Sequence, residues 1–223
     1  MASGGIREGK RMKILFEDKD VVVVVKPPHI LSQFSENEEN AVTILSEMTG
    51  GEIFVVSRLD RNVGGVMVFA KNQKSAADLT KQMQSGTFEK EYIAAVYGCP
   101  EEDQGTFEDL LFKDSRKNKS FVVKKERKGV KKASLSYEVL EKGDDLSLVK
   151  IHLHTGRTHQ IRVQFASRKM PLVGDGKYGA KDNSKEMGLF CREISFIKGK
   201  EKLTFSAEPG KVFPWNVFEN KNG

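Results

Sequence analysis

Arg58, Asp60 and Arg61 lie within four consecutive positions, between two apolar runs. A carboxylate flanked by two guanidinium groups stays ionised at neutral pH, because nearby positive charge favours its charged form. Gly64 and Gly65 follow closely, and they permit a sharp turn or the close approach of a ligand. A cluster of this kind is either an ion pair in a surface loop or a catalytic carboxylate with its neighbours. Other parts of the chain distinguish the two.

Three of the four histidines lie within eight residues, at His152, His154 and His159. His152 and His154 alternate on a predicted strand and therefore share a face, a spacing that metal sites use. No carboxylate or cysteine lies beside them in sequence, and the chain has no H-E-x-x-H, G-x-S-x-G or Walker motif. We expect no metal site here, and a metal-dependent hydrolase remains an alternative hypothesis.

Positive charge is concentrated in residues 113–132. The whole chain carries +6, whereas this segment has ten basic and two acidic residues, so the remainder carries 6 − 8 = −2. Phe121, Val122 and Val123 interrupt the basic residues and predict a strand with its loops. The segment is either a solvated hairpin face or a surface that contacts a phosphate backbone.

The apolar pattern predicts an α+β fold with a largely antiparallel sheet. Apolar and polar residues alternate in several predicted strands, and short turns join many of them. The five valines from Val21 predict a strand buried on both faces. The predicted strands are Lys13–Asp18, Val21–Val25, Ile53–Val56, Val66–Ala70, Thr87–Gly98, Thr106–Phe112, Ala133–Leu140, Leu146–His154, Leu189–Ile197 and Lys202–Ser206.

Three helices are predicted between these strands, at Ala41–Met48, Lys74–Gln84 and His159–Arg168. In the second helix the spacing indicates one buried face, and Ser85-Gly86 is a stop signal. That face comprises Ala76, Ala77, Leu79, Thr80 and Met83. Thr158 is the expected N-cap of the third helix.

We expect residues 1–12 to form a flexible basic leader and residues 13–223 to form a single domain. The first residues lack the apolar core of a signal peptide. The two cysteines, Cys99 and Cys191, lie far apart and outside any ligand pattern, which is typical of a reduced, cytoplasmic protein.

Five motifs in order along the chain resemble those of the RluA-like RNA pseudouridine synthases. The most specific is the string G-R-T-H-Q-I-R at Gly156–Arg162. The others are Lys26-Pro27-Pro28, Arg58-Leu59-Asp60 with Gly65, Lys90-Glu91-Tyr92 with Gly98, and Gly174-Asp175. The resemblance covers most of the chain, and we expect residues 13–223 to be a catalytic domain without the separate N-terminal RNA-binding domain that many relatives carry. It implies the pseudouridine synthase fold and an isomerase that acts on ribosomal or transfer RNA without a cofactor or metal. We expect the protein to be a monomer.

The resemblance also implies roles for individual residues. Asp60 matches the catalytic carboxylate, Tyr92 the tyrosine that stacks on the target base, and Arg162 the arginine that pairs with the catalytic aspartate. Arg58 matches the residue that helps to displace the flipped nucleotide. The remaining expected contacts with the substrate come from Lys26, Arg157, His159 and Gln160.

The turn around Asp60 departs from the family's usual H-R-L-D-x-x-T-S-G string. Ser57 stands in place of the histidine, Val63 in place of the threonine and Gly64 in place of the serine. Because the carboxylate and its arginine remain, we expect activity. A non-catalytic RNA-binding or RNA-chaperone protein on the same scaffold is the alternative.

Overall fold

The computed structural model describes residues 12–218, so the expected leader falls almost entirely outside the described residues. The described chain forms two compact units. The first comprises the residues up to Phe88 together with Ile194–Ala207, and the second comprises Glu89–Glu193 together with the residues from Glu208 onward. Strand β10 (Leu189–Lys198) contributes its first five residues to the second unit and its last five to the first.

The first unit is built on strands that the valine-rich pattern predicts. β1 (Lys13–Glu17), β2 (Val21–Lys26) and β4 (Gly64–Ala70) pair antiparallel in that order. β3 (Phe54–Val55) pairs with β4, and β11 (Glu201–Ser206) pairs with β10. Every residue of β4 is buried, and so are all but one of β2. The prediction of a buried strand over Ile53–Val56 is wrong, because only two of its residues form a strand and both are half-buried.

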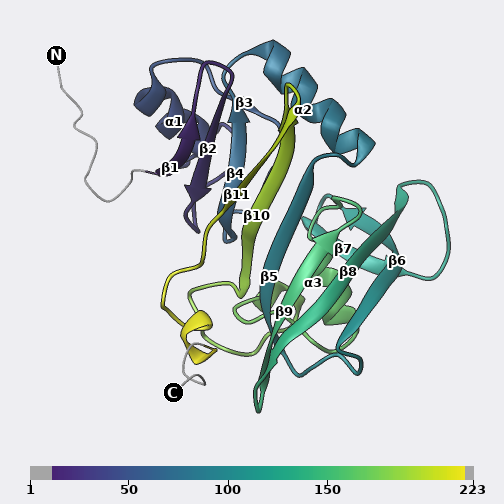
Figure 1. Cartoon of the computed structure of the whole chain (residues 1–223). Helices are drawn as coiled ribbons and strands as arrows, with labels where there is room; N and C mark the ends of the chain where they lie inside the picture. Colours follow the sequence, from purple (N-terminus) through teal and green to yellow (C-terminus); the bar gives the residue numbers. More distant parts are fainter. Residues whose placement is uncertain (1–11, 219–223) are drawn as a thin grey trace. The chain divides into compact units, whose positions relative to one another are not determined.

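Helices α1 (Ala41–Thr49) and α2 (Gln73–Ser85) complete the first unit (Figure 1). Gly86 ends α2 at a φ of 78°, which confirms the predicted stop signal. The predicted buried face of α2 is partly wrong, because Ala77 and Thr80 are exposed. Gln82 is buried instead: its amide donates to the carbonyl of Ile197 and accepts from its N–H, both at 2.7 Å.

The second unit is a run of long antiparallel strands. Its order is β10, β5 (Glu89–Tyr97), β9 (Leu146–Leu153), β8 (Val130–Lys142), β6 (Gln104–Asp114) and β7 (Lys119–Val123). The pairs from β5 to β7 are antiparallel. The predicted largely antiparallel α+β class is therefore confirmed.

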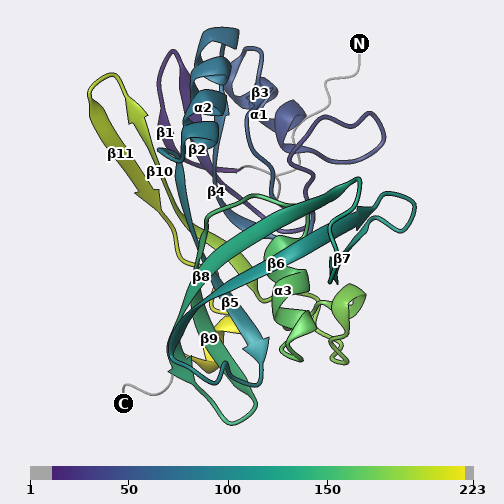
Figure 2. The same cartoon turned by 90° about the vertical axis from the view of Figure 1, so that its right-hand side faces the viewer.

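Helix α3 (Gln160–Ser167) packs against β6 and β7 of this unit (Figure 2). The ring of Phe165 lies 5.1 Å from that of Phe107, which in turn lies 4.6 Å from Tyr137. Thr158 is not the N-cap, contrary to the prediction. The N-cap is His159, in the left-handed conformation at a φ of 55° and without a side-chain capping bond. Two short 3₁₀ helices, η1 (Gly176–Tyr178) and η2 (Trp215–Val217), follow.

None of the helices among residues 12–218 has the length and apolar content that crossing a bilayer would require.

Candidate active site

The turn that carries Asp60 is clamped by a buried serine from a distant part of the sequence. The hydroxyl of Ser32 donates to the carbonyl oxygen of Leu59 at 2.8 Å and accepts from its N–H at 3.1 Å. The N–H of Val63 donates to the carbonyl oxygen of Asp60 at 3.0 Å, which closes the turn. Leu59 and Val63 are buried, whereas Asp60 is half-buried. The apolar neighbours therefore anchor the turn and leave the carboxylate at the edge of solvent.

The two arginines of the turn bind the loop that precedes α1. Arg58 donates from Nη1 to the Oε1 of Gln33 at 2.9 Å. Arg61 forms an ion pair with Glu38 at 2.5 Å and donates from Nε to the carbonyl oxygen of His29 at 3.3 Å. Both guanidinium groups thus connect the Asp60 turn to that loop. Arg58 and Arg61 remain exposed.

Lys26 is fully buried at the end of β2. Its ammonium group donates to the carbonyl oxygens of Pro27 at 2.8 Å, Ile30 at 2.9 Å and Arg61 at 3.4 Å. Burial lowers the pKa of Lys26 to about 7, and the negative charge of Asp60 opposes this shift. The three carbonyl oxygens match the three donors of an ammonium group. The structure therefore shows Lys26 supporting the Asp60 turn from inside, and its expected contact with substrate stays a prediction.

Gly65 meets this lysine directly, since the two residues are paired in the β2–β4 register. Its φ of 133° lies in a region that side chains rarely adopt, so the position requires glycine.

In the second unit, the turn before α3 is organised by Gln160. Its Oε1 accepts from the hydroxyl of Thr155 at 2.7 Å and from the N–H of Arg157 at 3.0 Å. Its Nε2 donates to the carbonyl oxygen of Ser134 at 3.0 Å. Gln160 is buried, so these contacts hold the turn together, and its expected contact with RNA stays a prediction. The exposed side chain of Arg157 donates from Nε to the carbonyl oxygen of Lys132 at 3.0 Å.

Arg162 is held in place by Asp175, which the sequence did not assign as its partner. Nε donates to Oδ2 at 2.7 Å and Nη2 donates to Oδ1 at 2.8 Å, a bidentate pair. The side chain of Arg162 is 8% exposed and that of Asp175 is 0% exposed, so the pair is shielded from water. The ring of Tyr178 lies beside the guanidinium group, 5.1 Å from its carbon. The Gly174-Asp175 motif was part of the resemblance, but local sequence gives no sign that its carboxylate reaches α3.

Tyr92 lies in the buried middle of β5, where it pairs with Ile151 of β9. Its side chain shares a hydrogen bond with the Cys191 thiol, and burial raises the pKa of that thiol to about 12. Cys191 is another neighbour that the sequence did not reveal.

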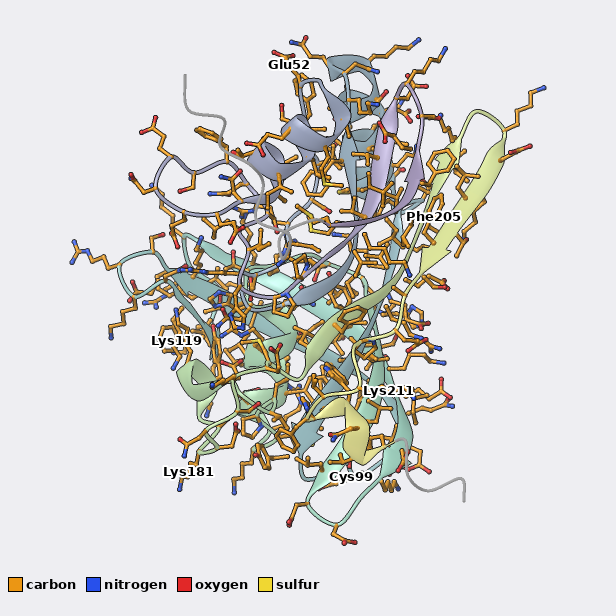
Figure 3. The ribbon with its side chains drawn as sticks, turned by 90° about the vertical axis from the view of Figure 1, so that its left-hand side faces the viewer. Glu52, Cys99, Lys119, Lys181, Phe205 and Lys211 are labelled. Carbon is orange, nitrogen blue, oxygen red and sulfur yellow. The ribbon has the colours of Figure 1, made fainter. Side chains whose placement is uncertain are left out.

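The basic segment 113–132 is a hairpin with its flanking loops, as predicted. β7 pairs antiparallel with β6, and β6 pairs antiparallel with β8. Nine of its ten basic side chains are exposed, and the exception is Lys119 (labelled in Figure 3), which is half-buried at the start of β7. The side chain of Arg127 lies over the ring of Phe112 at 4.7 Å. We call residues 113–132 the basic hairpin.

The histidine cluster divides between different surroundings. His152 lies 3.3 Å from Glu91, which also lies 3.7 Å from Arg192. His159 is within hydrogen-bonding distance of Tyr178, with 2.9 Å from Nδ1 to the hydroxyl oxygen. Within residues 12–218, no three His, Cys, Asp or Glu side chains converge as metal ligands would.

Comparison with known proteins agrees with these motifs. The model of the RNA pseudouridylate synthase family matches residues 20–167. A protein described as an uncharacterized RNA pseudouridine synthase of Mycoplasma pneumoniae is 33% identical over 210 residues, which are 91% of this chain and 68% of that protein. The dual-specificity RNA pseudouridine synthase RluA of Vibrio vulnificus is 33% identical over 197 residues, covering 84% of this chain and 78% of that protein.

The fold is shared with solved structures of the same class. Human RNA pseudouridylate synthase domain containing 1 superposes with a TM-score of 0.78 at 22% identity, covering 94% of this chain and 89% of the human one. The chain therefore belongs to the RNA pseudouridylate synthase family, a family of RNA-modifying isomerases. The resemblance to RluA-like enzymes and the pseudouridine synthase fold are both confirmed.

Proposed function

We propose that this protein converts specific uridines of structured RNA, ribosomal or transfer, to pseudouridine, with Asp60 as the catalytic carboxylate. The observation that carries the proposal is the agreement between family membership and the turn that holds Asp60. Ser32 fixes the backbone at Leu59, directly before the carboxylate, so a side chain at position 60 is presented from a rigid support. Such support is what a catalytic group needs to reach its substrate in a defined geometry.

The reaction is an isomerisation whose atoms balance within the nucleotide. The bond between ribose C1′ and uracil N1 breaks, the uracil turns, and a bond forms between C1′ and C5. The proton leaves C5 and N1 gains one, so no oxidant, reductant or group carrier is consumed and no cofactor is required. Breaking the glycosidic bond develops positive charge on the sugar, and the carboxylate of Asp60 stabilises or traps that charge.

The target uridine must leave its stack before Asp60 can reach it, which costs a few kcal/mol. We assign Tyr92 to stacking on the extruded base and Arg58 to the space that the base vacates. The exposed guanidinium group of Arg58 is tethered by Gln33 alone among its described contacts, so it exchanges one polar partner for another at small cost.

Arg162 is assigned as the ion-pair partner of Asp60. Its pair with Asp175 engages Nε and Nη2, which fixes the orientation of the guanidinium group. The exposed Arg157 and the half-buried His159 supply contacts to the RNA backbone, whereas Lys26 and Gln160 support the two loops from within.

The basic hairpin is proposed as the main electrostatic contact with RNA, and the protein as a cytoplasmic monomer. Nine exposed cations on one antiparallel hairpin suit a phosphate backbone, because each neutralised phosphate releases counterions. Reversing two of these charges, with Lys124→Glu and Lys125→Glu, should weaken RNA binding and flatten its salt dependence. Reversing the exposed Lys74 and Lys81 of α2 is the matched control, and equal effects of the two double variants would remove the hairpin from the interface.

The catalytic assignment is tested with Asp60→Asn on RNA labelled with tritium at C5 of uridine. Wild-type protein should release tritium, and its product RNA should form carbodiimide adducts at defined positions. The variant should release no tritium. The variant should keep its circular dichroism spectrum and its affinity for RNA. Asp103→Asn, at an exposed carboxylate paired with Lys142, serves as the control. Wild-type turnover by Asp60→Asn would end the assignment, and binding without turnover by the wild-type protein would favour the RNA-chaperone alternative.

A further inference from the structure

Tyr178 occupies the meeting point of three segments of the second unit. Its hydroxyl oxygen accepts from the N–H of Ser120, at the start of β7, at 2.8 Å. The same oxygen lies 2.9 Å from Nδ1 of His159, the residue that precedes α3. Its ring lies 5.1 Å from the guanidinium carbon of Arg162. One side chain of η1 therefore touches the basic hairpin, the left-handed His159 and the arginine held by Asp175.

The basic hairpin is fastened to the same place by further bonds. Lys119 donates from Nζ to the carbonyl oxygen of Lys177 at 2.5 Å, and Lys177 donates from Nζ to the carbonyl oxygen of Asn118 at 3.1 Å. The hydroxyl of Ser120 donates to the carbonyl oxygen of Thr158 at 2.6 Å. The start of β7, the turn before α3 and η1 thus form one hydrogen-bonded unit.

The arrangement around the Tyr178 ring is suited to fixing a cation. The ammonium group of Lys119 lies 4.9 Å from the ring centroid, and the ring of His159 meets it edge-on at 88°. Two nitrogens of the Arg162 guanidinium group are already bound to Asp175. The Tyr178 ring adds a cation–π contact to the same group, which further restricts its movement.

We propose that Tyr178 is a positioning residue that orients Arg162 and ties it to the RNA-contacting hairpin. The proposal rests on the proposed function, because it gives Arg162 its role towards Asp60. Tyr178 acts through Arg162 and does not itself touch the substrate. The hydroxyl bonds to Ser120 and His159 hold the ring, and the ring holds the guanidinium group. The start of β7 and the guanidinium group of Arg162 are therefore held by the same side chain.

Tyr178 contributes a hydroxyl group and an aromatic ring, and two substitutions remove them in turn. Tyr178→Phe keeps the ring beside Arg162 and removes both hydroxyl contacts. We expect it to lower the single-turnover rate on RNA about fivefold to tenfold, which corresponds to about one or two ordinary hydrogen bonds. Tyr178→Leu also removes the ring, and we expect a further loss of about fivefold from the missing cation–π contact. RNA affinity should change by less than about threefold for both, since no phosphate contact is lost.

Tyr97→Phe is the matched control. The Tyr97 hydroxyl makes a hydrogen bond to Asp182, which lies in the loop after η1 and binds the N–H of Gly174. Tyr97 has no described contact with Arg162. Removing it should leave the rate unchanged. A wild-type rate for Tyr178→Phe, a loss no larger than that of Tyr97→Phe, or a loss confined to RNA affinity would each overturn the proposal.

A second measurement keeps the proposal testable even if the protein makes no pseudouridine. The Nε–H proton of Arg162, identified in ¹⁵N spectra by its loss in Arg162→Lys, should exchange slowly with solvent because it is buried and bound to Asp175. Tyr178→Leu should accelerate that exchange at least about tenfold, whereas Tyr97→Phe should not. Unchanged exchange would show that Tyr178 does not position Arg162, whatever the activity of the wild-type protein.

Discussion

The buried pair between Arg162 and Asp175 gives the most quantitative prediction. Asp175→Asn keeps the shape of the side chain and removes its charge. Breaking a buried pair by removing one partner typically costs 3–5 kcal/mol, because the other charge remains buried without compensation. The amide oxygen of asparagine can still accept one of the two hydrogen bonds, at 2.7 and 2.8 Å, that the carboxylate accepts. We therefore expect a loss near the lower end, about 3 kcal/mol, out of a typical 5–15 kcal/mol.

The assay is urea unfolding followed by tryptophan fluorescence. Trp215 is the one tryptophan of the chain, and it is buried against Phe190 in the second unit, the same unit as the pair. Its signal therefore reports unfolding of the unit that the substitution affects. Glu208→Gln is the control, because its ion pair with Arg192 is largely exposed and should contribute less than about 1 kcal/mol.

A loss below about 1 kcal/mol for Asp175→Asn, or a loss equal to that of Glu208→Gln, would show that the pair is not a buried, uncompensated charge interaction of this strength. A further arm separates stability from catalysis. The double variant Arg162→Met with Asp175→Leu replaces the pair by apolar side chains of similar volume, and such replacements are often neutral in stability. It should recover most of the lost stability and still form no product, because the proposed ion-pair partner of Asp60 is absent.

Two further outcomes follow from single residues. Because the pKa of Lys26 falls from 10.5 to about 7 on folding, the unfolded chain binds a proton between these values that the folded chain does not. The free energy of unfolding should therefore rise with pH from about 7 towards 10 by up to about 1.4 kcal/mol per pH unit. In urea titrations at three pH values, Lys26→Met should lack that rise. Parallel profiles for the two proteins would contradict the lowered pKa of Lys26. Gly174→Ala should cost more than about 2 kcal/mol, since φ is 72° and the new Cβ would lie 2.2 Å from the carbonyl oxygen of Glu186. Gly176→Ala, with open space around its Cβ, is the control, and equal shifts in Tm for the two would contradict the steric argument.

Much of the fold was predictable because local patterns specify it. The valine run of β2, the alternation in β8 and the glycine that ends α2 each determine structure from a few neighbouring residues. The prediction for α3 was wrong at its start for a physical reason. A threonine N-cap is favoured locally, yet His159 takes the left-handed conformation while its Nδ1 lies within hydrogen-bonding distance of Tyr178, 19 residues away.

Long-range polar contacts were not predictable in the same way. Gln82 reads as the exposed side of an amphipathic helix, but it is buried because its amide completes the backbone bonds of Ile197, 115 residues away. The clamp of Ser32 on Leu59 spans 27 residues, and the pair between Arg162 and Asp175 spans 13. Each contact satisfies a buried polar group, which is a requirement of the folded chain and leaves no periodic trace in the sequence.

Burial divides the expected substrate-binding residues into two kinds that motif matching treats alike. Lys26 and Gln160 are buried, and every donor of the lysine ammonium group has a backbone carbonyl within reach. Arg58 and Arg157 are exposed, and each has only one of its guanidinium nitrogens in a described hydrogen bond. A polar residue in a motif can therefore serve to hold a loop through its hydrogen bonds, without itself contacting the substrate. Substitution of Lys26 or Gln160 should change stability together with activity, whereas substitution of Arg58 or Arg157 should change activity on RNA alone.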